Sequence, residues 1–181
     1  MWNIVAVILV LAIVAIGLLE VYQSYESGTN AQSGQNLVTE VSSTIANLQT
    51  VYGQSPNFSN FSGATPYNVG ALPSDWTGTN GTYTIASGGT VTFAVASNAG
   101  GTDNGYSMSF SNLSVGQCAA LADFSVPEMY SSSVNGNSVS NPAFQGGTGT
   151  TTTGTSSWPP ILAASCTNTG SNNTIVYNII G

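Results

Sequence analysis

The chain has 181 residues, seven Asp and Glu, two Cys and no Lys, Arg or His, so its formal net charge is −7 at pH 7. Nucleic-acid binding through cationic contacts to phosphate is therefore excluded. The same absence removes imidazole metal ligands and the commonest general bases, which argues against an enzyme, a metal site or a cofactor. With 4% charged residues, the surface must be solvated by uncharged polar groups. This composition favours a protein exposed outside the cell in an acidic environment. Compositional drift in a secreted protein is the alternative explanation.

Residues 1–19 (MWNIVAVILVLAIVAIGLL) form an apolar segment in which Asn3 is the one polar side chain. As a helix the segment would extend about 29 Å, which matches the hydrocarbon core of a bilayer. It lacks the basic flanks of a signal peptide or an ordinary anchor, so we interpret Met1 as a processed N-terminus from which a basic leader was removed. Because the segment is apolar on every face, we expect lipid or other copies of itself to cover it. A simple single-pass anchor is the alternative.

Small residues in the apolar segment would let neighbouring helices approach closely. The side chains expected to pack in a bundle of these helices are Trp2, Ile4, Val5, Ile8, Leu9, Leu11, Ala12, Ile13, Ile16, Gly17 and Leu19. We predict a helical stem over residues 1–27 and a hinge or linker over residues 28–35, where glycines weaken a helix. Residues 36–181 are expected to form the globular head.

An amphipathic helix is predicted over residues 36–52, because apolar residues recur there at steps of four, four, three and four. Asn36 is the expected N-cap, and Gly53 followed by Pro56 is expected to end the helix. The residues of the apolar stripe, which we expect to pack on a sheet, are Leu37, Val41, Ile45, Leu48 and Tyr52.

The remainder of the chain shows the signals of strands and turns. Strands are predicted over residues 82–85, 90–95, 106–110 and 174–180, where β-branched and aromatic residues gather between glycine-rich turns. A short helix is predicted over residues 117–124, and the Thr- and Ser-rich residues 131–157 are expected to form an exposed loop. The expected fold class is therefore α+β, with the long N-terminal helix packed on a small antiparallel sheet.

These features, in this order, resemble a type IV pilin. The residues that carry the resemblance are 37–53 (LVTEVSSTIANLQTVYG), 72–75 (LPSD), 88–95 (GGTVTFAV) and 106–121 (YSMSFSNLSVGQCAAL). The chain is most similar to the bacterial type IVb group, which includes thin-pilus pilins of conjugative systems. The resemblance implies the pilin fold and a non-enzymatic structural subunit that polymerises through its N-terminal helix into an extracellular pilus filament.

The resemblance also implies partners and a location. The partners would be other copies of the chain, a prepilin peptidase and the pilus assembly machinery, and the N-terminal residue, here Met1, would be methylated. The unassembled pool would reside in the inner membrane. A membrane-anchored minor pilin, a pseudopilin or a binding module that does not form fibres remains the alternative reading.

One position departs from the pattern of the bacterial family. The family usually has a glutamate four residues after the mature N-terminus, and this chain has Val5 there. Its first carboxylate is Glu20, about 22 Å further along a helix. Archaeal pilins, which also lack that glutamate, therefore stay open as a second alternative.

Cys118 and Cys166 are the two cysteines, and an even pair in an extracellular type of chain predicts one disulfide. A catalytic or metal-bound pair is disfavoured, because the chain lacks CxxC spacing and histidine. The carboxylate pair Asp123 and Glu128 is disfavoured as a glycosidase site, and Asp75 and Asp103 do not form a calcium-binding pattern.

Several asparagines match the N-glycosylation pattern, and surface glycans would be partners only if the host modifies them. Ser/Thr clusters over residues 131–133 and 150–157 are candidates for O-linked sugar. The candidate N-glycosylation sites are Asn57, Asn60, Asn80, Asn112 and Asn172.

Overall fold

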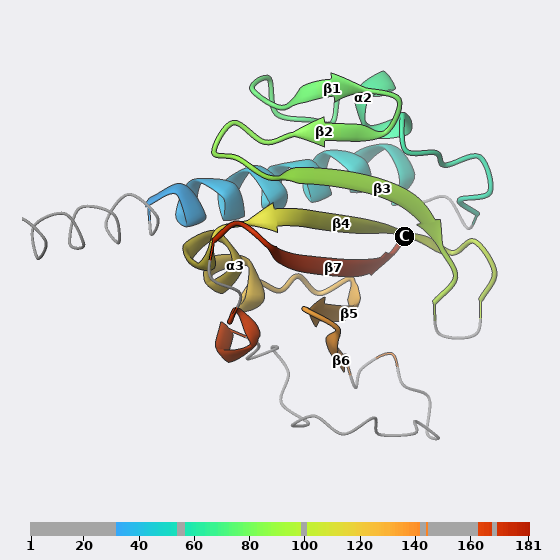
Figure 1. The fold of residues 1–181 in the computed structure, drawn as a ribbon. Coiled ribbons are helices and arrows are strands. Elements are labelled where there is room, and N and C mark those ends of the chain that lie inside the picture. The colour runs from blue at the N-terminus through green and yellow to red at the C-terminus, as the bar shows by residue number, and fades with distance from the viewer. Residues whose placement is uncertain (1–31, 54–56, 99–100, 142–143, 145–162, 168–169) are drawn as a thin grey trace, which may run out of the picture.

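The computed structural model describes residues 32–53, 57–98, 101–141, 144, 163–167 and 170–181. Within them, a helix over residues 32–52 lies across one face of a seven-stranded antiparallel sheet (Figure 1). The expected α+β class is confirmed, and the sheet is larger than predicted. The strands are β1 (Thr77–Thr79), β2 (Thr82–Thr84), β3 (Thr90–Ala96), β4 (Gly105–Leu113), β5 (Met129–Val134), β6 (Asn137–Ser140) and β7 (Asn173–Ile180).

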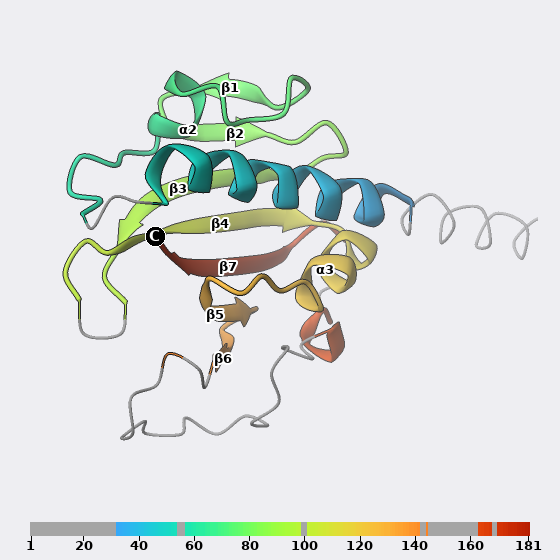
Figure 2. The same cartoon turned by 180° about the vertical axis from the view of Figure 1, so that it is seen from behind.

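Shorter helical segments with described bounds accompany the sheet: α2 (Thr65–Asn68), α3 (Val115–Ala122) and the 3-10 turn η2 (Ala163–Ser165). The strand order is β1-β2-β3-β4-β7-β5-β6, so the last strand of the chain lies inside the sheet, between β4 and β5. Seen from behind, the long helix lies in front of β3 and β4, and α3 lies near the beginning of that helix (Figure 2). The long helix and α3 therefore cover the same face of the sheet.

The long helix begins earlier than predicted. It is already formed at residue 32, so Asn36 lies inside it and the predicted N-cap at Asn36 is wrong. Gly34 explains the difference, because its missing side chain lets the helix touch α3. A Cβ at Gly34 would lie 2.8 Å from the Cβ of Ala120 and 2.9 Å from the carbonyl oxygen of Gly116. This tertiary contact outweighs the low helix propensity of glycine. Of the predicted hinge, residues 32–35 are helical and residues 28–31 lie outside the described residues.

The predicted strands over 82–85, 90–95, 106–110 and 174–180 are confirmed as β2, β3, β4 and β7, and the predicted helix over 117–124 corresponds to α3. The helix α3 begins two residues earlier than predicted because Ser114 caps it. The Ser114 hydroxyl accepts a hydrogen bond from the Gln117 backbone amide, and the Gln117 side chain accepts one from the Ser114 amide. This reciprocal pair is a capping box.

The predicted loop over residues 131–157 is wrong in its first part, where β5 and β6 form a hairpin. Asn135 and Gly136 make the turn with φ of 48° and 85°, which is the Asn-Gly signal of a two-residue hairpin. Asn135 Nδ2 also donates to the Ser165 carbonyl oxygen at 2.7 Å and to Asn173 Oδ1 at 2.9 Å. The hairpin is thereby tied to η2 and β7. Residues 145–157 lie outside the described residues.

The predicted stem, residues 1–27, also lies outside the described residues. Among the helices of the described part, none combines the length and the apolar content needed to cross a membrane.

Candidate functional site

The apolar stripe of the long helix lies against the sheet. Leu37, Val41 and Leu48 have no exposed surface, and Ile45 is 2% exposed. Tyr52 is partly buried at the edge of the same core. Burial stabilises such side chains by roughly 1.5–3 kcal/mol each, so this stripe fixes the helix on the sheet.

An aromatic cluster holds the C-terminal end of the helix. The ring centroid of Tyr52 lies 5.4 Å from that of Phe58 and 5.7 Å from that of Phe61. Phe61 stacks on Tyr106 of β4 at 5.3 Å. Burial raises the pKa of the Tyr106 hydroxyl, and the Glu128 charge adds to this effect. Aromatic pairs contribute about 0.5–1.5 kcal/mol beyond their buried area, so the cluster locks the last helical turn in place.

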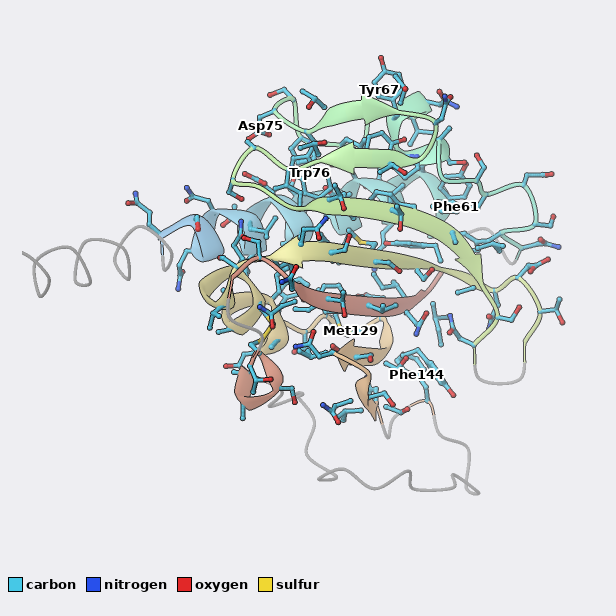
Figure 3. The ribbon with its side chains drawn as sticks, viewed as in Figure 1. Phe61, Tyr67, Asp75, Trp76, Met129 and Phe144 are labelled. Atoms are coloured by element: carbon cyan, nitrogen blue, oxygen red, sulfur yellow. A yellow bond between two sulfur atoms is a disulfide. The ribbon has the colours of Figure 1, made fainter. Side chains whose placement is uncertain are left out.

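A polar contact joins the middle of the helix to the segment before β1. The indole Nε1 of Trp76 donates a hydrogen bond to Glu40 Oε2 at 2.8 Å, and Trp76 is 6% exposed. Figure 3 labels Trp76 and its neighbour Asp75 on the segment that leads into β1. Desolvation raises the pKa of the Glu40 carboxyl, the indole hydrogen bond lowers it, and the Asp75 charge raises it again, with a net upward shift. Sequence reasoning missed this contact, because residues 36 positions apart carry no periodic signal.

The predicted disulfide is confirmed. Cys118 of α3 and Cys166, directly after η2, are bonded with an S–S distance of 2.00 Å and a Cα–Cα distance of 5.8 Å. Two further contacts fasten α3: Gln117 Nε2 donates to Ser87 Oγ at 2.8 Å, and the Tyr177 hydroxyl donates to the Leu121 carbonyl oxygen at 2.6 Å. The helix α3 is thus bonded to the β2–β3 turn, to β7 and to the segment after η2.

The face of the sheet that the long helix and α3 do not cover is turned toward the viewer in Figure 1. We call it the open face, and Ser and Thr side chains dominate it. The sequence predicted β2, β3, β4 and β7 but not β1, and it did not reveal this face, whose signal was the repeated Thr-x-Thr pattern of β1, β2 and β3. Its hydroxyl residues are Thr77, Thr79, Thr82, Thr84, Thr90, Thr92, Ser107, Ser109, Ser111, Ser131 and Ser133.

The candidate glycosylation asparagines are all exposed. Asn57 and Asn60 follow the long helix, Asn80 lies in the β1–β2 turn, Asn112 lies near the end of β4, and Asn172 directly precedes β7. Asn80 and Asn112 both have φ of 58°, a backbone conformation that asparagine tolerates better than most residues. Modification of these residues stays a prediction.

The carboxylates that could suggest an enzyme do not gather into a metal site. Asp123 is the C-cap of α3 and Glu128 precedes β5. In the described part of the chain, no group of three His, Cys, Asp or Glu side chains could hold a metal ion. The predicted filament-core residues from Trp2 to Leu19, and the modification site at Met1, lie outside that part.

A long helix packed on an antiparallel sheet, with a disulfide in the C-terminal part, defines a pilin-like structural domain. The protein family described as PilS N terminal matches residues 31–180. The chain therefore belongs to that family and is a type IV pilin-family protein. A search of the curated proteins found no match. Membership points to a structural role and to a pilus-associated position at the cell surface or membrane.

Proposed function

We propose that the chain is a major pilin, the structural subunit that polymerises through its N-terminal segment into an extracellular type IV pilus filament. The observation that carries the proposal is a helix packed on its own sheet downstream of an apolar segment long enough to span a bilayer. The helix is fully formed at residue 32 and anchored on its own sheet by the buried stripe, while the apolar sequence of residues 1–19 lies upstream.

The proposed mechanism is a change of surroundings for the apolar segment. Before assembly, residues 1–19 are covered by lipid of the inner membrane. During assembly they transfer into a bundle of the same segments from other copies, since exposing each large side chain to water costs about 1.5–3 kcal/mol. Contacts between different surfaces of successive copies do not close into a ring, so they generate a helical fibre.

The proposal includes the partners that membership of the family suggests. A prepilin peptidase would process the chain ahead of the apolar segment, and assembly machinery would lift the subunit from the membrane. Val5 replaces the usual glutamate, so the register between copies would depend on packing and on polar groups near Asn3.

The experiment is electron microscopy of fibres sheared from cells that produce the full chain. Ala12→Phe and Gly17→Phe place a large ring where neighbouring stems must approach, so both variants should abolish fibres while the chain still inserts in membranes. The matched control is Ala86→Phe, an exposed position in the β2–β3 turn, which should leave fibres intact. Normal fibres from both stem variants would contradict the proposal, and wild-type chain found only as an anchored monomer would favour the minor-pilin alternative.

A further inference from the structure

Two rows of hydroxyl groups cross the open face from β1 to β4. Within each row, the residues of neighbouring strands are directly opposed in the strand registers, so the rows run perpendicular to the strands. Neighbouring strands are about 4.8 Å apart, and alternate residues on one strand are about 6.7 Å apart. We call the two rows together the hydroxyl track. In strand order they are Thr77, Thr84, Thr90, Ser111 and Thr79, Thr82, Thr92, Ser109.

The β1 and β2 half of the track keeps its hydrogen-bonding capacity free. Its threonines are exposed and make no side-chain hydrogen bond with the rest of the described chain. In the other half, Thr90 Oγ1 and Ser111 Oγ lie 2.7 Å apart, and Thr92 Oγ1 donates to the Ser109 carbonyl oxygen at 3.5 Å. A hydroxyl is both a donor and an acceptor, so the track can accept and donate along its whole length.

Charge excludes most classes of partner. The described carboxylates lie on the long helix, on the segment before β1 or on segments between strands, so none of them belongs to either row. The chain has no Lys, Arg or His to attract an anion. The carboxylates that would attract a cationic partner lie outside the track. An anionic partner would be repelled by the net charge of −7. The track therefore fits an uncharged partner.

The side chains of the track also argue against a protein partner. Protein interfaces are anchored by buried Trp, Tyr and Arg side chains, and the track consists of Thr and Ser alone. Burying its hydroxyls against an apolar surface would cost free energy, because their hydrogen bonds to water would be lost without replacement. A fitting partner must offer many donors and acceptors at regular intervals.

From this geometry we infer that the hydroxyl track binds an extended, uncharged polysaccharide of the β-linked glucan class. Such a chain lying along the rows meets one hydroxyl of each row at every strand, and the strand spacing is close to the repeat of one sugar residue. Each hydroxyl contact is weak, and many tracks on one fibre would raise the overall affinity for the polysaccharide through multivalency. The inference goes beyond assembly, because a single head carries the complete track.

The test measures sedimentation of the detergent-solubilised full chain with amorphous cellulose. The wild-type chain is expected to sediment with cellulose and not with oxidised cellulose, an insoluble polysaccharide that carries carboxylates. The double variant Thr82→Val and Thr92→Val removes two opposed hydroxyls while keeping the shape and the strand preference, and it should bind at least tenfold more weakly. The variant Thr82→Ser with Thr92→Ser keeps the hydroxyls and should retain binding. The matched control is Thr39→Val with Thr50→Val, both exposed on the long helix.

Three results would overturn the inference. They are a wild-type chain that does not sediment with cellulose, equal sedimentation with oxidised cellulose, and a valine double variant that binds as well as wild type with an unchanged melting temperature. If the valine variant alters self-association and not glucan binding, the track is a contact between copies and the inference also fails. Because the assay uses unpolymerised chain, its outcome is independent of whether fibres form.

Discussion

The two faces of the sheet are built from the same strands and have opposite characters. On the face under the long helix, Tyr83, Val91 and Phe110 are buried. On the open face, Thr82 and Thr92 alternate with them and point the other way. Because side chains alternate along a strand, a Thr-x-Thr pattern around a buried residue makes one face a core and the other a hydroxyl surface.

The difference between the two faces explains how a chain with so little charge stays hydrated. The covered face is stabilised by burial of apolar area, and the open face is solvated by hydroxyls that do not titrate. Acidification therefore changes the charge of the helix and the loops, where the described carboxylates lie. It does not change the charge of the open face.

The largest predicted effect on stability comes from removing the disulfide that fastens α3 on the covered face. Replacing Cys118 and Cys166 by Ala should lower the free energy of unfolding by about 4 kcal/mol, because the bond closes a loop with a sequence separation of 48. Urea unfolding of the full chain in detergent measures this. The same double variant under reducing conditions is the control, since reduction should destabilise wild type and leave the variant unchanged. An equal response of both proteins would contradict the prediction.

The next prediction compares the loss of stability caused by one substitution on each face of the sheet. Leu48→Ala opens a cavity under the helix and should cost about 2–5 kcal/mol, because Leu48 is fully buried. Thr92→Val on the open face should change stability by less than about 0.5 kcal/mol. Chemical denaturation of the two variants measures both changes in the free energy of unfolding. Similar losses at the two positions would show that the open face is covered in the native protein.

The smallest predicted effect is the pH dependence of stability that arises from the Glu40 carboxyl. Its raised pKa means that the folded state binds a proton more readily than the unfolded state, so stability increases as the pH falls through the folded-state pKa. Glu40→Gln removes the desolvated charge and keeps an oxygen for the Trp76 indole. Its melting temperature should exceed that of wild type at about pH 7, and the difference should vanish near pH 3, below the ordinary value of 4.5.

Asp75→Asn is the companion variant for this prediction. It removes the like charge beside Glu40 and should give a smaller shift in the same direction, since desolvation is the larger cause. A melting difference between Glu40→Gln and wild type that is the same at both pH values would refute the assignment.

The sequence predicted the elements that have a strong periodic pattern. The buried stripe of the long helix and the four strands rich in β-branched and aromatic residues were recognised because their hydrophobic spacing is local information. Strands β5 and β6 were missed because their serines resemble loop composition, although the Asn135-Gly136 pair signalled the hairpin. The helix start was misplaced because the contact of Gly34 with α3 depends on residues far along the chain.

The candidate site was predictable to a similar extent. The cysteine pair followed from counting, whereas the Glu40–Trp76 contact and the hydroxyl track exist only once the strand order is known. Cross-strand neighbours such as Thr79 and Thr82 are set by register, which a single sequence does not specify.

Intact-mass analysis of fibres sheared from producing cells determines whether this chain is the main subunit of a surface fibre. We expect one dominant species with the mass of this chain, two hydrogens lighter for the Cys118–Cys166 bond, together with any N-terminal methyl group or attached sugar. Fibres made of another protein, with this chain recovered only from the membrane fraction, would contradict it.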